Sequence, residues 1–214
     1  MKCQWGMFLL IVSILVVITV GEGSRGATAA PESGGVIKRV SVTSDGTEAN
    51  NGSGSSAISA DGRYIAFTSG ATNLVLGDTN GDGGVFLHDR QNGITSRVSV
   101  ASSDGDLAIS ADGRNLAFVS YANDQSDVYV HDRQTGQTPL ISRHTDGTKG
   151  NDYSAAPSIS ADGRFIAFHS RSTNLVNDDA NGQFDVFLHD RQTKQTTLIS
   201  RSTGGAPGNG GSSA

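Results

Sequence analysis

Short apolar runs alternate with turn-forming residues along the chain after residue 35. In the run YIAFTS (64–69), Ile65 and Phe67 face one side of an extended strand, whereas Tyr64 and Ala66 face the other. Neither side is purely polar, so we expect both faces of the strand to be covered. No stretch in this part of the chain shows a helical periodicity of useful length. The pattern predicts an almost entirely β protein.

The apolar runs belong to a repeat with a period of about 50 residues. The segments ISADGRYIAFTS, ISADGRNLAFVS and ISADGRFIAFHS are each followed by an HDR motif (VFLHDR, VYVHDR, VFLHDR) and by a fourth run such as ITSRVSV. Short strands at this period favour propeller blades over a solenoid. The predicted fold class is therefore an all-β propeller of four-stranded antiparallel blades, with three blades in residues 36–201. Small alanines in the second strand of each repeat allow the blades to approach closely: Ala66, Ala117 and Ala167.

The SADGR segments read as turns between the first and second strands of each repeat. Asp-Gly between two strand runs is typical of a two-residue type I′ turn, which needs positive φ at both central residues. Reactive groups rarely occur once per repeat, so a structural role is favoured over a catalytic one. The predicted turn residues are Asp61, Gly62, Asp112, Gly113, Asp162 and Gly163.

The repeated motifs resemble a known family. The pattern S-x-DGR-x-IAF-x-S, followed by DVF-x-HDR-x-TG and RVS, is similar to the TolB-type, WD-like β-propeller repeat of exported bacterial proteins, and the resemblance covers Val36 to Arg201. It implies four-stranded blades, a periplasmic or extracellular setting and an interaction or scaffolding role, and it names no ligand. One departure is the alanine of SADGR, where many family members have proline; it leaves the turn prediction unchanged.

The HDR motifs do not predict acid–base chemistry. Adjacent residues of a strand point to opposite faces, so His88 and Asp89, for example, cannot act together as a dyad. Pairing of the aspartate with an arginine near the following turn is the favoured interpretation. No H-E-x-x-H, C-x-x-C, G-x-S-x-G or phosphate-cradling motif occurs in the sequence. No catalytic residue is predicted.

Loop length divides the two ends of the predicted blades. The first-to-second and third-to-fourth connections are uniformly short, whereas the other connections are long in the first and third repeats and short in the second. Loops that vary over a fixed scaffold are where binding usually occurs. We therefore expect a protein, peptide or glycan partner to bind the long-loop face, with a notch over the second repeat.

The segment DTNGDG in the first long loop matches the start of a calcium-binding loop. Alternate oxygen side chains followed by glycine curl round a hard cation in such loops. The related segment of the third repeat keeps Asp179 and Asn181 and adds Asp185, but has glutamine at the third ligand position. The alternative is a polar Asn-Gly turn without metal. The predicted calcium ligands are Asp78, Asn80 and Asp82.

The N-terminus predicts export. The apolar run Met7–Val20 has the length of a signal-peptide core and is short for a membrane span, and ATA at 27–29 offers a cleavage site, so residues 1–29 read as a signal peptide. An uncleaved N-terminal anchor is the alternative. Without residues 1–29 the formal net charge is about −6, against −5 for the whole chain, which disfavours nucleic-acid binding. The single cysteine would also be lost, which suits a periplasmic or extracellular location.

The repeat boundaries predict an incomplete propeller. The segment VIKRVSV (36–42) matches the fourth-strand run ITSRVSV, and residues 202–214 match the lead-in to a further blade. An open array would expose an apolar face, so self-association to complete a ring is expected. The favoured function is an exported, non-catalytic interaction or scaffold module. The alternative is an accessory propeller of a larger hydrolase or peptidase whose catalytic domain is absent from this sequence.

Overall fold

The residues that the structure describes form eleven strands, which pair antiparallel within three sheets. The computed structural model describes residues 36–78, 83–99, 106–122, 125–179, 181–206, 208 and 210–212. The chain divides into two compact units, Met1–Ile37 and Lys38–Ala214, and every strand belongs to the second unit. Within the described residues no helix is long and apolar enough to cross a bilayer. The predicted signal peptide lies outside these residues.

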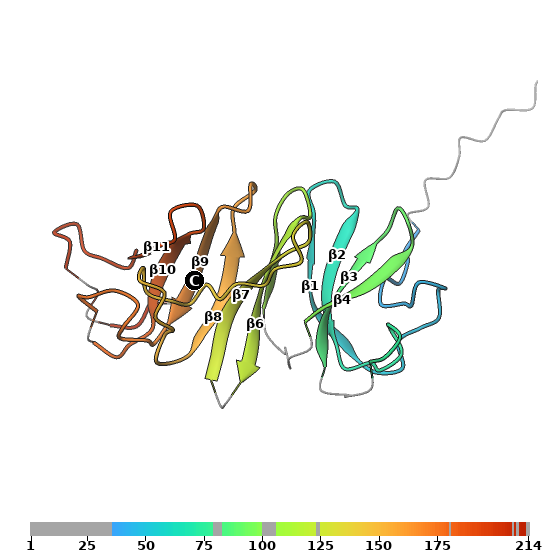
Figure 1. The fold of residues 1–214 in the computed structure, drawn as a ribbon, viewed down its shortest axis with the longest axis horizontal. Coiled ribbons are helices and arrows are strands. Elements are labelled where there is room, and N and C mark those ends of the chain that lie inside the picture. The colour runs from blue at the N-terminus through green and yellow to red at the C-terminus, as the bar shows by residue number, and fades with distance from the viewer. Residues whose placement is uncertain are drawn as a thin grey trace, which may run out of the picture. The chain divides into compact units, whose positions relative to one another are not determined.

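The strands form three sheets, which we call the first, second and third blades. In each sheet the strands are hydrogen-bonded in the order of the sequence, as Figure 1 shows. The first blade contains β1 (Ser53–Ile58), β2 (Tyr64–Ser69), β3 (Gly84–Asp89) and β4 (Ile94–Ser99). The second contains β5 (Leu107–Ile109), β6 (Asn115–Ala122) and β7 (Gln125–Asp132). The third contains β8 (Ser154–Ile159), β9 (Phe165–Ser170), β10 (Asp185–Asp190) and β11 (Gln195–Leu198).

Two of the expected strands do not form. In the second blade, the fourth run is joined to β7 by isolated bridges at Leu140 and Gln137 instead of a continuous ladder. Pro139 lies in this run and has no N–H to donate, although its carbonyl accepts a bond from Val130. The predicted outer strand at 36–42 is also wrong: residues 36–41 are irregular, and Val42 makes a single bridge with Glu48.

The core lies between the blades. Ala66, Val85 and Leu87 of the first blade pack against Leu116 and Phe118 of the second. A second core joins the second and third blades and contains Ala117, Val119, Val128, Val130, Ile141, Ile166, Phe168, Leu175, Phe187 and Leu198. The predicted two-sided burial of the second strand is therefore confirmed, because both of its faces contribute to hydrophobic clusters.

Each SADGR segment forms a tight turn that is closed by a backbone bond. The N–H of Gly62 donates to the carbonyl of Ser59 (2.8 Å), and the carboxylate of Asp61 accepts bonds from the Ser59 hydroxyl (2.6 Å) and the Arg63 N–H (2.9 Å). Positive φ occurs at Gly62, Gly113 and Gly163 (69°, 69° and 71°) but at none of the three aspartates. The expected type I′ geometry is therefore wrong. Aspartate stays on the negative-φ side, and glycine at the last turn position takes up the left-handed conformation.

Adjacent SADGR turns also bond to each other across the blades. The N–H of Ala60 donates to the carbonyl of Ala111 (3.0 Å), and the N–H of Ala111 donates to that of Ala161 (3.0 Å). Gly113 lies directly against the ring of Tyr64 in the preceding blade. The repeated motif is thus a seam that holds neighbouring blades together, which explains why it recurs in every repeat.

The HDR motifs complete this seam. Asp89 accepts a two-pronged pair from Arg63, with Nε–Oδ1 at 3.0 Å and Nη2–Oδ2 at 2.7 Å. Arg90 donates to the carbonyl of Gly62 (2.7 Å), and Nδ1 of His88 contacts the hydroxyl of Thr95 (2.9 Å). The aspartate and the histidine thus have separate partners. The same pairs recur in the other blades, as Arg114–Asp132 and Arg164–Asp190.

Candidate binding face

The long connections gather at one end of the blades, the lower edge of the view in Figure 1. We call this end the long-loop face; it carries the β2–β3, β6–β7 and β9–β10 connections and the segments that lead into β1, β5 and β8. The opposite end carries the SADGR and HDR turns and is called the tight-turn face. The antiparallel order of each sheet produces this division, as the sequence predicts.

In the first blade, an asparagine clasp locks the two long loops together. The backbone N–H of Asn50 donates to the side chain of Asn73, and the Asn50 side chain exchanges two bonds with Thr72, all at 2.9 Å. The Asn73 amide then donates to the carbonyl of Glu48 (2.8 Å). The loop that enters the blade and the loop at its middle therefore form one rigid unit.

The third blade repeats the clasp with equivalent residues. Asn151 bonds to Asn174 and Thr173 at 3.0 Å, and the Asn174 amide donates to the carbonyl of Lys149 (2.9 Å). Behind the clasp, Leu175 is fully buried in the core between the second and third blades. The clasp was not predicted, although a signal existed: the segment TNLV occurs in both long loops and follows an asparagine at the same spacing.

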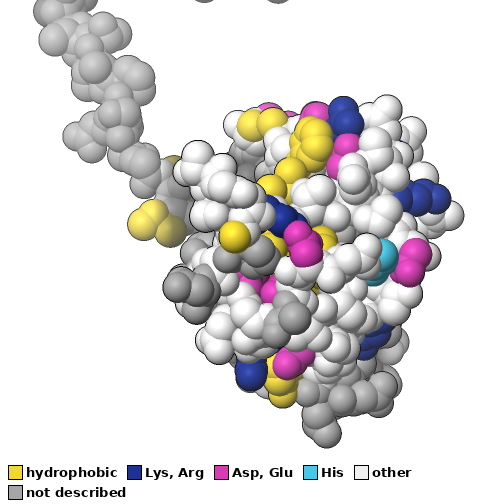
Figure 2. Space-filling view, turned by 90° about the vertical axis from the view of Figure 1, so that its left-hand side faces the viewer, with side chains coloured by type: hydrophobic (Ala, Val, Ile, Leu, Met, Phe, Trp, Pro, Cys, Tyr) yellow, Lys and Arg dark blue, Asp and Glu magenta, His cyan; other side chains and the backbone are white. Residues whose placement is uncertain are grey.

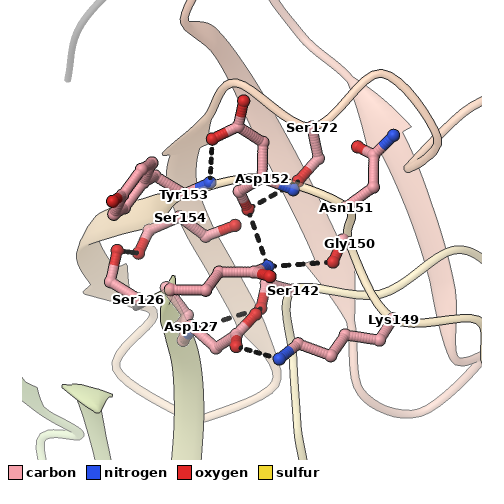
Figure 3. A network of polar contacts seen from close by, with 12 residues as sticks. Ser126, Asp127, Ser142, Lys149, Gly150, Asn151, Asp152, Tyr153, Ser154 and Ser172 are labelled. Atoms are coloured by element: carbon pink, nitrogen blue, oxygen red, sulfur yellow. Dashed lines mark hydrogen bonds and ion pairs between the residues drawn. The ribbon is translucent and has the colours of Figure 1, made fainter. Parts of the chain in front are cut away.

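At the long-loop face the second blade differs from its neighbours, and the notch expected over it stays a prediction. Its β6–β7 connection is short, and the start of β7 bonds to the neighbouring loop instead of carrying a long loop of its own (Figure 3). The amide of Gln125 donates to the carbonyls of Gly150 (2.9 Å) and Asp152 (3.0 Å), and the hydroxyl of Ser126 donates to the carbonyl of Ser154 (3.1 Å). The segment entering the third blade is thus held from two sides.

An ion pair with a buried carboxylate reinforces this contact. The carboxylate of Asp127 is almost fully buried and pairs with the ammonium of Lys149 (2.7 Å), and it also accepts a bond from the hydroxyl of Ser142 (3.0 Å), as Figure 3 shows. Removing one partner of such a pair leaves a buried charge without compensation. The Lys149 segment is therefore fixed to the second blade.

Three partly exposed aromatic side chains lie at this end of the strands. Tyr121 is near the end of β6, Tyr153 directly precedes β8 and Phe184 directly precedes β10; they are 46%, 42% and 38% exposed. In Figure 3 the ring of Tyr153 points away from the polar network. Phe184 packs edge-on against His169, with ring centroids 5.1 Å apart. Aromatic side chains with one exposed side are common anchors in recognition surfaces.

A hollow of about 700 Å³ lies beside the first blade, between residues 43–45 and 72–78. Leu76 at its border is fully exposed. Hydrogen bonds from Thr43 and Thr47 lower the pKa of Asp45 in its wall to about 2, so this carboxylate is charged at neutral pH. The hollow thus combines apolar and anionic surface, and its volume lies in the range of small ligand sites.

The hollow on the tight-turn face is differently built. Its volume is about 630 Å³, and its lining includes Arg114, Arg164, Asp132 and Asp162. These four groups are already bonded within the repeat motifs, Arg114 to Asp132 and Asp162 to its own turn. The tight-turn face therefore carries structural pairs, and the candidate binding surface is the long-loop face.

The structure describes one of the three predicted calcium ligands. Asp78 is buried and pairs with Arg97 at 2.6 Å, so calcium binding there would require the carboxylate to exchange the guanidinium for the ion. Asn80 and Asp82 lie outside the described residues. In the described ranges, no group of three or more His, Cys, Asp or Glu side chains is placed to hold a metal. Calcium at the first repeat stays a prediction.

Known structures share this fold. A protein identified as a TolB from Agrobacterium tumefaciens is 22% identical, with a TM-score of 0.50, and the match covers 73% of this chain and 48% of that one. The β-propeller domain of the Trilobed protease from Pyrococcus furiosus is 15% identical, with a TM-score of 0.49 and coverage of 72% and 45%. The chain thus spans about half the length of these proteins. No protein-family model matches the sequence, and no curated protein matches it. The fold is that of a TolB-type β-propeller.

Proposed function

We propose that this chain is an exported, non-catalytic interaction module that binds an extended peptide segment of a partner protein on its long-loop face. The observation that carries the proposal is the set of partly exposed aromatic residues Tyr121, Tyr153 and Phe184, at strand ends next to interlocked loops. Rigid loops lower the entropy that binding costs, and exposed rings supply apolar contact area. The apolar run at 7–20 supports export through a signal peptide.

Charge supports a peptide over a nucleic acid. The whole chain carries a formal net charge of −5, and the hollow of the first blade presents the ionised Asp45 beside the exposed Leu76. A segment with an apolar and a basic side chain would match these two groups. Sequence-independent binding to phosphates would instead need a basic surface.

A peptide selection tests the proposal. The full chain is immobilised and panned against a random peptide phage library, and enriched sequences are synthesised with a fluorophore for anisotropy titration. We expect the substitutions Tyr153→Ser and Phe184→Ser to weaken binding at least about tenfold, because anchor residues contribute most of the affinity. The matched control is Gln192→Ala, an exposed residue of the tight-turn face.

The outcomes separate the alternatives. If Gln192→Ala weakens binding and both aromatic substitutions leave it unchanged, the peptide binds the tight-turn face and the proposal is wrong. If no peptide is enriched and the chain binds a glycan array in a way that Tyr153→Ser abolishes, the long-loop face is the binding site but the partner is a glycan. A fractionation experiment tests export separately: the chain in the cytoplasmic fraction of a bacterial host would contradict it.

A further inference from the structure

One oxygen of a buried carboxylate in the third blade lacks a hydrogen-bond partner. Asp179 lies in the β9–β10 connection and is 3% exposed, and its Oδ1 atom has no hydrogen-bond partner. Burial and the nearby Asp185 raise the pKa of Asp179 above its ordinary value. A buried carboxylate with an unsatisfied oxygen is costly unless something compensates its charge. The neighbouring Asp178 takes the arginine of this region, because Arg201 pairs with Asp178 at 2.7 Å.

A second buried carboxylate lies beside it. Asp185 at the start of β10 is fully buried and accepts bonds from the hydroxyl of Ser200 (2.6 Å) and the amide of Asn181 (2.8 Å). The same amide donates to the carbonyl of Gly208 (2.9 Å). The Asn181 side chain therefore turns its N–H groups to these two oxygens, and its own oxygen accepts a bond from the N–H of Gln183 (2.7 Å). The carboxylate of Asp179 lies near enough for the charge of Asp185 to raise its pKa.

The first blade shows how the same place is neutralised when a cation is built in. There Asp78 occupies the position of Asp179 and pairs with Arg97 at 2.6 Å, and Arg97 also donates to the carbonyl of Gly83 (2.9 Å). Gly84 leaves room for this arginine, since a Cβ at that position would lie 2.8 Å from its Nε.

In the third blade, other residues stand at the positions of Arg97 and Gly84. Leu198 stands at the position of Arg97, because each pairs with the equivalent phenylalanine of its blade, Phe187 and Phe86. Asp185 stands at the position of Gly84, directly before the matching valine. The first blade thus pairs its one carboxylate with a buried arginine. The third blade holds two carboxylates at that place, and its arginine, Arg201, forms its ion pair with the neighbouring Asp178.

We propose that the carboxylates of Asp179 and Asp185 bind a calcium ion in the third blade, where it supplies the charge that Arg97 supplies in the first. The ion would take the place of the Asn181 amide as a partner of Asp185. Calcium takes six to eight oxygen ligands at flexible geometry, so backbone carbonyls and water would complete its shell. Two carboxylates predict the weak affinity of extracellular modules, with a Kd of about 10⁻⁴ to 10⁻³ M. The inference is independent of the proposed peptide-binding function.

Calorimetric titration of the full chain with calcium chloride, after treatment with a chelator, tests the site. We expect binding of one ion in the wild type and a loss of at least about tenfold in affinity for Asp179→Asn, because the variant lacks the charge that calcium needs. Two controls should keep wild-type affinity: Asp178→Asn, whose carboxylate pairs with Arg201 at the surface, and Asp78→Asn in the first blade.

Unfolding midpoints measured with and without calcium show whether a variant that fails to bind calcium is still folded. Without calcium, Asp179→Asn should not lower the unfolding midpoint, because it removes a buried charge with an unsatisfied oxygen. Asp78→Asn should lower it, because it removes the carboxylate that pairs with Arg97. Calcium at 10 mM, about ten times the weaker expected Kd, should raise the midpoint of the wild type and of Asp78→Asn but not of Asp179→Asn. No heat with the wild type at that concentration, or equal affinity in Asp179→Asn, would overturn the proposal. Loss of binding in Asp78→Asn alone would place the ion in the first blade instead.

Discussion

The glycine of the SADGR turn offers a direct test of the seam between blades. Gly62 and Gly113 have the same φ of 69°, so alanine at either position meets the same backbone strain. Their surroundings differ. A Cβ at Gly113 would lie 2.3 Å from Cδ2 of Tyr64 in the preceding blade, whereas the nearest atom to a Cβ at Gly62 is Nη1 of Arg90, at 3.5 Å. The two substitutions therefore differ in the contact between blades.

The magnitudes follow from these two terms. Alanine in the left-handed region costs about 1–2 kcal/mol, which applies to both variants. Overpacking against the Tyr64 ring adds about 1–3 kcal/mol in Gly113→Ala alone. We therefore expect Gly62→Ala to lower the free energy of unfolding by about 1–2 kcal/mol and Gly113→Ala by about 2–5 kcal/mol.

Urea unfolding of the full chain, followed by far-UV circular dichroism, measures both variants. A double-variant cycle with Tyr64→Ala then isolates the ring contact. Only the Cβ of residue 64, 3.0 Å from the new methyl, remains, so Gly113→Ala should cost less in this background than in the wild type, with a coupling energy of about 1–3 kcal/mol. Equal destabilisation by the two glycine substitutions, or additivity in the cycle, would refute the seam between the first and second blades.

Three further substitutions probe the remaining contacts. Asn151→Ala removes two side-chain bonds to Thr173 and should cost about 1–3 kcal/mol in urea unfolding, with faster proteolysis in the clasped loops. The hydrogen bonds from Arg63 lower the pKa of Asp89 to about 2. The Arg63–Asp89 pair therefore contributes its full stabilisation above the ordinary pKa of 3.8 and loses it as the pH falls towards 2. Arg63→Lys should flatten that part of the curve of unfolding free energy against pH. Burial lowers the pKa of His189 to about 4, so stability should fall from pH 6.5 to 4 in the wild type and much less in His189→Gln, as thermal melts across this range would show.

The local sequence pattern predicts the strand faces and the turn positions, because both depend on residues that are adjacent in the sequence. Alternation in YIAFTS assigns Phe67 and Ala66 to opposite faces correctly, because side chains of a strand alternate strictly. Asp-Gly marks the position of each turn because glycine readily adopts the positive φ that the turn requires. The predicted turn type was wrong because Asp-Gly occurs in more than one type of turn. The bond that closes this turn runs from the N–H of Gly62 to the carbonyl of Ser59, which lies outside the Asp-Gly pair.

Contacts between repeats were beyond such reasoning. That Gly113 meets Tyr64, or that Ala60 bonds to Ala111, depends on the angle at which one blade packs on the next. The candidate face was predicted from loop length alone, but its asparagine clasps were not, because they join residues of two loops that only the folded sheet brings together. The missing outer strand at 36–42 has a similar cause: a matching sequence forms a strand only when a neighbouring strand pairs with it.

The comparison of blades within one chain shows where the repeats differ in chemistry. On the tight-turn face the arginine of SADGR and the aspartate of HDR keep the same two bonds in all three blades. On the long-loop face, one backbone position holds Gly84 in the first blade, Asp127 in the second and Asp185 in the third. Arginine fills the space beside Gly84, Lys149 neutralises Asp127, and Asp185 lies near the carboxylate of Asp179. Two blades therefore carry their own cation at this position, whereas the third leaves one oxygen of Asp179 without a partner, which is the basis for the calcium site that we propose there.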